Sequence, residues 1–283
     1  MWGDIAIAFL LAFITAFVIT PYSIRLAKKV GAVDYPNDRR VNKKPMPRLG
    51  GIAVIAGFLV SAIYLIITMR IENNIDFITD GLGKKLLGFL FGAMVLGITC
   101  YIDDVKGISP LAKLAGQLIA AIIVVSCGVR IDNFTIPFKE NSIMINEVIS
   151  YILTIGWIVG ITNAINLIDG LDGLSSGITL IACISMLIIF SLNESPLIAI
   201  ILITALAGAI VGFLPYNFNP AKTFIGDVGS NFMGYAISII SILGVAKTYT
   251  AIVIIAPIIV LALPIFDTLW AIVRRIVKTK SIK

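Results

Sequence analysis

Long apolar runs are the feature that most constrains how this chain can fold. Nine stretches are uncharged or nearly so, and their lengths approach or reach the roughly 20 residues that a helix needs to cross a bilayer. They cover residues 5–22, 49–69, 86–102, 114–129, 148–168, 174–192, 197–216, 232–246 and 248–273. Hydrophobic residues make up 59% of the 283 and charged residues only 13%, a balance that excludes a soluble globular domain. The sequence therefore predicts an all-α polytopic membrane protein with about nine transmembrane helices, forming one domain over residues 1–283.

The basic residues predict which way the chain crosses the membrane. With the N-terminus outside, sixteen of the 22 Lys and Arg residues fall on one face of the membrane and six on the other. Loops rich in Lys and Arg stay in the cytoplasm. The predicted cytoplasmic segments are residues 23–48, 103–113, 163–173 and 215–231, together with the C-terminus. The net charge of +6 reflects this bias and the anionic inner leaflet, so it does not indicate a nucleic-acid partner.

The predicted outer face offers little room for function. Residues 129–138 and 142–146 alternate with a period near two, which predicts a small exterior β-hairpin. The remaining outer loops are short, so functional residues are expected on the inner loops.

Three acidic motifs lie at the ends of predicted spans, all on the predicted cytoplasmic face. They are Tyr101-Ile-Asp-Asp104, Asn163-Ala-Ile-Asn-Leu-Ile-Asp-Gly-Leu-Asp-Gly173 and Phe224-Ile-Gly-Asp-Val-Gly-Ser230. Carboxylates are costly at a membrane, and the chain has no histidine. Catalysis would have to rest on carboxylates, basic side chains and a metal ion, so the motifs suggest a metal-dependent site on one membrane surface.

Asp103 and Asp104 end the third predicted span. Neighbouring residues on a helix point about 100° apart, so the two carboxylates are expected to face different partners. Negative charge is unfavourable at a helix C-terminus unless a cation is near. Lys113 follows nine residues after Asp104, and two interpretations of it stay open: a membrane-edge anchor, or a group that neutralises a substrate phosphate.

The second motif is the most specific in the chain. Asp169 and Asp172 have a spacing of three residues and share a face if the segment is helical. Asn163 and Asn166 repeat that spacing one to two turns earlier and extend a polar stripe into the apolar run. A helix cap explains one such residue but not four, so the motif predicts a binding site.

The third motif places Asp227 between two glycines, directly before the eighth predicted span. Glycines leave backbone N–H groups open to a ligand, and a helix N-terminus favours a phosphate. Ser230 fits the N-cap of that span better than Asp227 does, which leaves Asp227 for another role. Asn217 and Lys222 lie just upstream and are further candidates for substrate binding.

In the first predicted cytoplasmic loop, Arg48 and the pair Gly50-Gly51 directly precede the second span. That position makes Arg48 a candidate for lining a phosphate site.

Together these motifs resemble the polyprenyl-phosphate N-acetylhexosamine-1-phosphate transferases, of the glycosyltransferase family 4 type. The resemblance runs in order from about residue 33 to residue 275 and rests on Pro45-Met-Pro-Arg-Leu-Gly-Gly51 and on the three acidic motifs with Lys113. It implies transfer of a sugar 1-phosphate from a UDP-N-acetylhexosamine, most similar to the UDP-N-acetylglucosamine branch, onto undecaprenyl phosphate. UMP would be released at the inner face of the bacterial cell membrane, at the start of teichoic acid, O-antigen or related glycan synthesis.

The resemblance also implies roles for individual residues. Asp227 looks like the ligand of Mg²⁺, for which Mn²⁺ could substitute, and Asp103 and Asp104 look like the acidic pair that handles the lipid phosphate. The residues that look like holders of the nucleotide or its phosphates are Lys113, Asn163, Asp169 and Asp172.

The chain departs from the family pattern at two places. Relatives usually carry a histidine-rich loop after the ninth span, whereas this chain stops at Lys283, and Asn42 stands where relatives often have histidine. Two explanations stay open: a truncated form that lacks the histidine-bearing loop and the last helices, or a member that has lost part of its phosphate clamp. In either case the chain as given is expected to bind UDP-sugar but to turn over slowly.

Several alternatives remain open at this point. The muramoyl-pentapeptide branch of the same family is the nearest one. A transporter that uses the carboxylates for ions is a second class, although such proteins more often place their polar site near the bilayer midplane. A binding protein that holds the nucleotide sugar or lipid without turnover is a third, and a homodimer is one expectation for the assembly.

Overall fold

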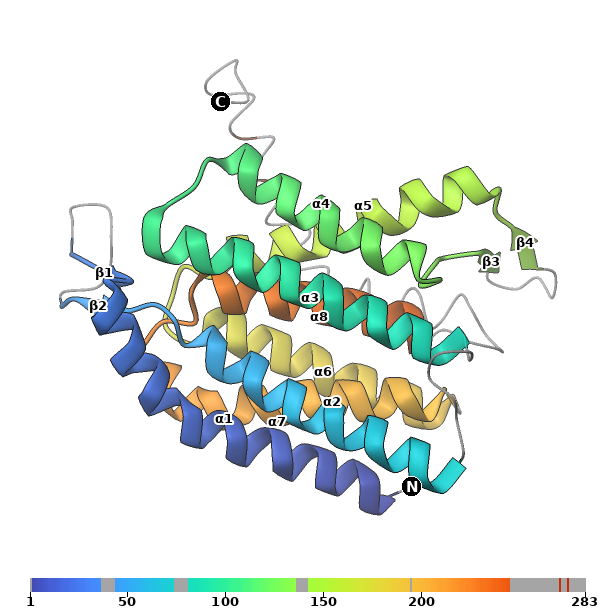
Figure 1. The fold of residues 1–283 in the computed structure, drawn as a ribbon, viewed down its shortest axis with the longest axis horizontal. Helices are drawn as coiled ribbons and strands as arrows, with labels where there is room; N and C mark the ends of the chain where they lie inside the picture. Colours follow the sequence, from blue (N-terminus) through green and yellow to red (C-terminus); the bar gives the residue numbers. More distant parts are fainter. Residues whose placement is uncertain are drawn as a thin grey trace.

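The structure is a computed structural model of a helical bundle, which describes residues 2–36, 44–73, 81–135, 142–193 and 195–244 with Trp270 and Arg274. Within these residues it contains eight helices and two small antiparallel sheets (Figure 1). The helices are α1 (Trp2–Val30), α2 (Gly51–Asn73), α3 (Gly81–Lys106), α4 (Pro110–Ser126), α5 (Glu147–Leu167), α6 (Leu174–Leu192), α7 (Leu197–Asn217) and α8 (Gly226–Gly244). The strands are β1 (Val33–Asp34), β2 (Met46–Pro47), β3 (Asn133–Thr135) and β4 (Ser142–Met144).

The helices follow the first eight predicted apolar runs, so the all-α polytopic architecture is confirmed. Six of the described helices, namely α1, α2, α3, α5, α6 and α7, are long and apolar enough to span a membrane, and α4 is a shorter apolar helix. The ninth predicted run, residues 248–273, lies outside the described residues apart from Trp270. The total of nine spans therefore stays a prediction.

Helix α7 lies at the centre of one half of the bundle. Its apolar window is 83% buried, against at most 44% for the other five spans, because α1, α2, α6 and α8 all pack against it. Small residues permit this close packing: a side chain at Gly208 or Gly212 would collide with the α1 backbone at Phe9 or Phe13. Helices in a membrane associate through such small-residue contacts, since lipid supplies no hydrophobic drive between them.

The other half of the bundle surrounds α8. Figure 1 shows α3 and α8 in the middle, with α1, α2, α6 and α7 on one side and α4 and α5 on the other. The α8 helix packs against α5 and α3 and is buried along nearly its whole length. A residue at the start of α8 can therefore reach groups on several helices at once.

The segment before α2 is tied to the segment before α8. β1 pairs with β2, with Val33 opposite Pro47. The Phe224 N–H donates to the Pro47 carbonyl, and the N–H groups of Gly50 and Gly51 donate to the carbonyls of Phe224 and Ile225. These bonds hold the Arg48 backbone beside the N-terminus of α8.

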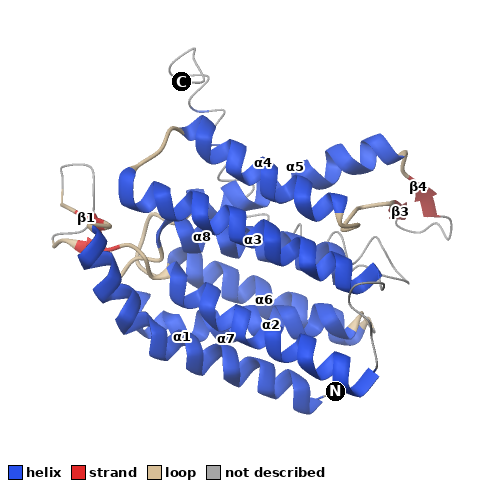
Figure 2. Ribbon diagram, in the orientation of Figure 1, coloured by secondary structure: helices blue, strands red, loops and turns tan. Residues whose placement is uncertain are grey.

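β3 and β4 form the second sheet, at the opposite end of the bundle (Figure 2). Asn133 pairs with Met144 and Thr135 with Ser142, antiparallel. These strands fall in the two segments for which a hairpin was predicted. The exterior location of this end stays a prediction.

Candidate active site

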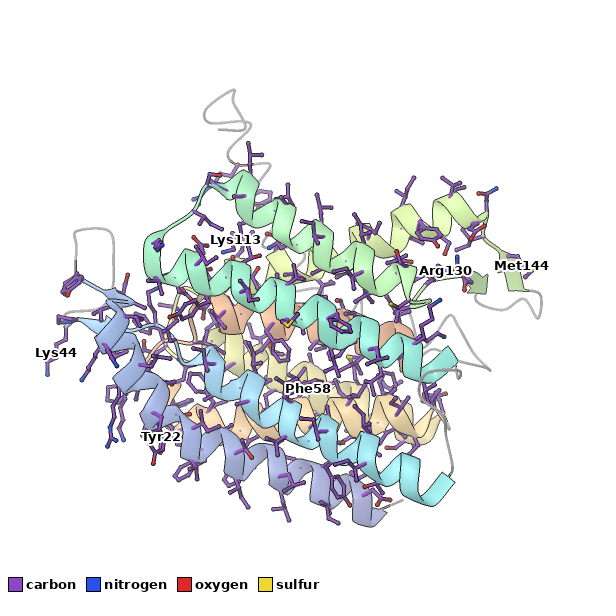
Figure 3. The ribbon with its side chains drawn as sticks, in the orientation of Figure 1. Tyr22, Lys44, Phe58, Lys113, Arg130 and Met144 are labelled. Atoms are coloured by element: carbon purple, nitrogen blue, oxygen red, sulfur yellow. The ribbon has the colours of Figure 1, made fainter. Side chains whose placement is uncertain are left out.

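The three acidic motifs come together at one end of the bundle. The C-terminal ends of α3, α5 and α7 meet the N-terminal ends of α4, α6 and α8 there, together with the segment that carries Arg48. In Figure 3, Lys113 lies at this end, whereas Arg130 and Met144 lie at the other. Successive helices run in opposite directions, so loops far apart in sequence share one surface.

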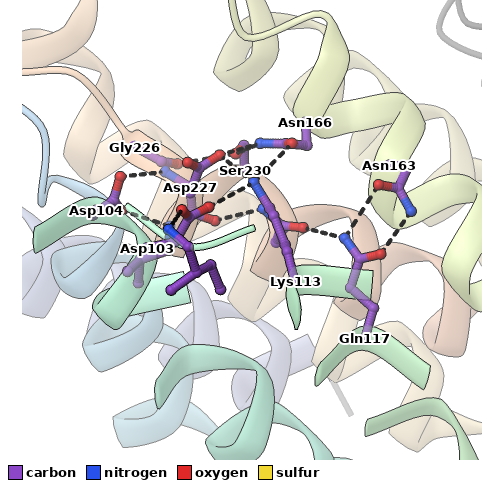
Figure 4. Close-up of polar contacts among 12 residues, drawn as sticks. Asp103, Asp104, Lys113, Gln117, Asn163, Asn166, Gly226, Asp227 and Ser230 are labelled. Carbon is purple, nitrogen blue, oxygen red and sulfur yellow. Dashed lines mark hydrogen bonds and ion pairs between the residues drawn. The ribbon is translucent and has the colours of Figure 1, made fainter. Parts of the chain in front are cut away.

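Asp227 is the centre of the polar contacts at this end. Its Oδ1 atom accepts hydrogen bonds from Lys113 Nζ at 2.6 Å and Asn166 Nδ2 at 2.7 Å (Figure 4). Its Oδ2 atom lies 3.2 Å from Arg48 Nη2. The side chain keeps 19% of its surface exposed, so it can still reach a ligand. Three segments, namely α4, α5 and the segment before α2, thus converge on one carboxylate of α8.

Lys113 points into this cluster. Besides Asp227, its ammonium contacts Asp103 Oδ2 at 3.2 Å and Asn166 Oδ1 at 3.2 Å, and its side chain is 16% exposed. A membrane-edge anchor would extend its ammonium to water instead. The geometry favours the interpretation of Lys113 as a site residue over that of an anchor.

Asp103 and Asp104 face different partners, as predicted for neighbours on a helix. Asp103 Oδ1 accepts from the Ile108 N–H just beyond the end of α3, and its Oδ2 faces Lys113. Asp104 points into the bundle, and its side chain has no exposed surface. Of these two neighbours, Asp103 is the one whose carboxylate has some surface left for a substrate.

Asp104 caps the N-terminus of α8 from a different helix. Its two carboxylate oxygens accept from the N–H groups of Asp227 and Val228 at 3.1 and 2.9 Å, and Arg48 Nη2 lies 3.0 Å away. The first N–H groups of a helix have no partner within it, and negative charge is favourable there. Asp104 therefore fixes the turn that carries Asp227.

The prediction that Ser230 would cap this helix is wrong. The helix begins four residues earlier, at Gly226, because Asp104 supplies the cap. Ser230 Oγ donates to the Gly226 carbonyl and accepts from Asn166 Nδ2.

Gly226→Ala is expected to lower the stability of the fold. Gly226 has φ +71°, and a Cβ there would collide with the Arg48 carbonyl and lie 2.8 Å from Asp104 Oδ2. Backbone strain of this kind costs about 1–3 kcal/mol before the collision is counted. A thermal unfolding midpoint in detergent measures the loss. Gly177→Ala on α6, where a Cβ would meet open space, is the matched control, and equal midpoints for both variants would contradict the argument.

The second motif divides at the end of α5. Asn163 and Asn166 lie on the helix and face α4 and α8, as the predicted polar stripe requires. Asp169 and Asp172 follow the last helical residue, Leu167, so the conditional prediction that they share a helical face does not apply. They project from the turn that leads into α6.

These two aspartates are held by different partners. Asp169 Oδ1 accepts from Ser175 Oγ at 2.6 Å. Asp172 Oδ2 accepts from Asn219 Nδ2 and from the Ala221 N–H at 3.2 and 3.0 Å. Asp172 thereby joins the α5–α6 turn to the α7–α8 loop.

Asp169→Asn is expected to change how stability depends on pH. Burial raises the pKa of Asp169 to about 6 against the opposing hydrogen bond from Ser175. Because the folded-state pKa lies above the unfolded value, the wild type should lose stability as pH rises from about 4 to about 6, by at most about 3 kcal/mol. Unfolding midpoints across this range should therefore fall for the wild type and stay flatter for Asp169→Asn. Parallel curves would contradict the shift.

A cavity of about 970 Å³ opens at this end of the bundle. Its size is that of a small-molecule site. Among the predicted site residues, those that line it are Arg48, Asn166, Asp169, Asp172, Asn217 and Asp227. The predicted site residues outside the lining are Asp103, Asp104, Lys113, Asn163 and Lys222. Of these, Asp104 contacts the lining residue Arg48, Lys113 contacts the lining residue Asp227, and Asp103 contacts Lys113.

Asn217 and Lys222 differ in their surroundings. Asn217 is buried, accepts from Ser176 Oγ at 2.9 Å and donates to the Thr223 carbonyl at 3.1 Å. Lys222 lies over the ring of Tyr216, with Nζ 5.6 Å from its centroid. The substrate-binding role of Lys222 stays a prediction.

The sequence prediction missed the buried amides Gln117 and Asn231. Gln117 lies one turn after Lys113, and Asn231 one turn after Asp227. A polar residue one turn inside an apolar run is the signal that could have identified them.

The donors at the cavity suit a hard divalent cation. Mg²⁺ prefers oxygen ligands and in proteins commonly takes one or two carboxylates, completing its shell with water and substrate phosphates. Asp227 offers a partly exposed carboxylate on the cavity wall, and Asn166 Oδ1 lies nearby. Within the described ranges, no group of three His, Cys, Asp or Glu side chains is placed to hold a metal ion by itself.

The sequence is similar to known transferases of one family. Residues 86–245 match the family model for glycosyl transferase family 4. A probable undecaprenyl-phosphate N-acetylglucosaminyl 1-phosphate transferase of Bacillus subtilis (strain 168) is 43% identical over 98% of this chain and 74% of its own length. A decaprenyl-phosphate N-acetylglucosaminephosphotransferase of Mycobacterium tuberculosis is 34% identical over 93% of this chain and 69% of its own. A phospho-N-acetylmuramoyl-pentapeptide-transferase of Staphylococcus epidermidis is 34% identical over 84% and 74%.

Proposed function

The chain belongs to glycosyl transferase family 4 and is an enzyme, and we propose that it transfers N-acetylglucosamine 1-phosphate from UDP-N-acetylglucosamine to undecaprenyl phosphate. In this reaction an oxygen of the lipid phosphate forms a bond to the sugar-bearing phosphorus of the donor. The bond from that phosphorus to the bridging oxygen breaks, and UMP leaves. The site would face the cytoplasm, consistent with the basic residues of the inner loops.

The observation that carries the proposal is the convergence of Lys113 and Arg48 on Asp227 at the wall of the cavity. Phosphoryl transfer needs little covalent chemistry from the protein, and depends on positioning and on positive charge around the developing phosphate charge. Lys113 and Arg48 supply that charge from α4 and from the segment before α2. Because both are already held by carboxylates, they are oriented before a substrate arrives.

Asp227, with Asn166 beside it, is the proposed position for Mg²⁺. A bound Mg²⁺ would neutralise charge on the donor phosphates. The chain's own contribution is to hold the Asp227 carboxylate still, through Asp104 at the backbone and Asn166 at the side chain.

Asp103 is the proposed acid–base group for the lipid phosphate. Its Oδ2 atom lies 3.2 Å from Lys113 Nζ, and its side chain retains exposed surface. The lipid phosphate attacks either the donor itself or a phospho-enzyme formed from it. Rapid quenching distinguishes the two routes, because a trapped phosphorylated aspartate would establish the covalent one.

The donor is assigned to the N-acetylglucosamine branch because of the relatives. Those whose names include N-acetylglucosamine reach 43% identity over 98% of the chain, whereas the muramoyl-pentapeptide transferase reaches 34% over 84%. The muramoyl-pentapeptide donor is the second candidate.

Release of UMP tests the proposal directly. The purified protein in nanodiscs is mixed with UDP-N-acetylglucosamine or UDP-N-acetylmuramoyl-pentapeptide, with and without undecaprenyl phosphate, over a Mg²⁺ titration ended by chelator. We expect UMP only when N-acetylglucosamine donor, lipid phosphate and Mg²⁺ are all present. Release with the pentapeptide donor alone would reassign the substrate, and donor binding without any release would favour a binding protein.

A further inference from the structure

We infer that three amides, the buried Gln117 and Asn231 and the partly buried Asn163, form a positioning network that sets how α4, α5 and α8 meet beneath the candidate active site. The inference rests on the proposed function for its kinetic consequences, but not for its structural ones. We name these residues the amide triad.

The amide triad forms a closed set of hydrogen bonds. Gln117 Nε2 donates to Asn231 Oδ1 at 2.7 Å and to Asn163 Oδ1 at 3.2 Å. Asn163 Nδ2 returns a bond to Gln117 Oε1 at 2.7 Å (Figure 4). Asn231 Nδ2 donates to the Asp227 carbonyl at 2.8 Å. Turning the Gln117 amide over would set its oxygen against two oxygens, so the network itself determines the orientation.

The amide triad lies one helical turn below the groups that meet at Asp227. Gln117 follows Lys113 by four residues, and Asn231 follows Asp227 by four. Asn163 precedes Asn166 by three. On a helix, residues at these spacings lie on one face. Each helix therefore carries one site residue and, directly beneath it, one member of the triad.

Burial raises the free-energy cost of breaking the hydrogen bonds of the amide triad. Gln117 is 2% exposed and Asn231 has no exposed surface. A buried amide without partners is costly, so helix arrangements that break the set are disfavoured. Apolar contacts between these helices have no comparable directional preference. The bonds thus select the arrangement in which Lys113 Nζ and Asn166 Nδ2 both reach Asp227 Oδ1.

The first test measures local opening and needs no substrate. Hydrogen exchange of the whole protein in nanodiscs is compared for wild type, Gln117→Met and Asn231→Leu. We expect exchange in peptides that cover residues 226–231 to rise about tenfold in both variants. Tyr235→Phe is the matched control: it removes a buried bond from α8 to the Phe89 carbonyl but lies outside the triad. Equal exchange in all four proteins, or the same rise in Tyr235→Phe, would overturn the inference.

The second test is kinetic. Each triad variant should lower kcat about tenfold, with the KM for UDP-N-acetylglucosamine and the amount of nucleotide bound per folded protein unchanged. A loss of folded protein would instead reduce the nucleotide bound in step with the rate. Because both variants break the bond between Gln117 and Asn231, the loss in Gln117→Met with Asn231→Leu should be smaller than the product of the two single losses, whereas fully multiplying losses would contradict a shared network.

The two tests separate this inference from the proposed function. If the wild type released no UMP, the proposed function would fail, and the exchange comparison would still decide whether the amide triad positions α8. If the wild type were active and Gln117→Met had normal kcat and normal exchange, the amide triad would be overturned and the proposed function would stand. If Gln117→Met fails to fold, both tests are made with Asn231→Leu, which removes the other partner of the same hydrogen bond.

Discussion

Asp227→Asn is expected to lower the rate of sugar-phosphate transfer by about 10³-fold, the upper part of the range for loss of one charged group at a reaction centre. The amide would keep the shape of the side chain but remove the charge that holds Lys113 and Arg48. It would also replace the proposed carboxylate ligand of Mg²⁺. Single-turnover transfer over a Mg²⁺ titration measures the effect, and near-normal transfer at ordinary Mg²⁺ would rule out the assigned role.

The control for this variant is Asp132→Asn. Asp132 also forms an ion pair and accepts a hydrogen bond, from Ser150 Oγ at 3.0 Å, but it lies at the opposite end of the bundle near β3. Its loss should leave transfer at the wild-type rate. A similar slowing in both variants would mean that any lost carboxylate disturbs the protein, and the special position of Asp227 would have no support.

The helices and the convergence of the motifs were predictable because both depend on local signals. Apolar runs of membrane length can only be helices or closed barrels in a bilayer, and short loops force neighbouring helices to alternate in direction. From that alternation it follows that the 163–173 segment and Asp227 share a surface. The polar stripe of Asn163 and Asn166 was likewise visible from their spacing.

What the sequence could not show are contacts made between helices. The cap that Asp104 gives to α8 joins residues more than 120 positions apart, so the start of α8 was placed too late and Ser230 was assigned the wrong role. Gln117 and Asn231 are each a single amide in an apolar run, which marks them as unusual but does not show which group each one binds. Their significance appears only from the hydrogen bond that joins α4 to α8 in the folded protein.

Substitution of Asp103 should lower mainly the transfer rate, whereas substitution of its neighbour Asp104 should lower mainly the stability of the fold. Asp103→Asn is expected to lower kcat about 10²-fold, the scale of a lost acid–base group, with an unfolding midpoint close to that of the wild type. Its side chain is partly exposed and contacts Lys113, so its removal leaves no charge buried without a partner.

Asp104→Asn should act mainly on stability. Its carboxylate is fully buried, pairs with Arg48 and accepts from two N–H groups of α8. An amide keeps one oxygen but sets its NH₂ group against a donor, and breaking a buried ion pair from one side costs about 3 kcal/mol or more. The unfolding midpoint in detergent and the rate per folded molecule are measured for both variants. Equal small losses at both positions would refute the division. A fully stable but inactive Asp104→Asn would mean that Asp104 reaches the substrate, and the capping role would then be secondary.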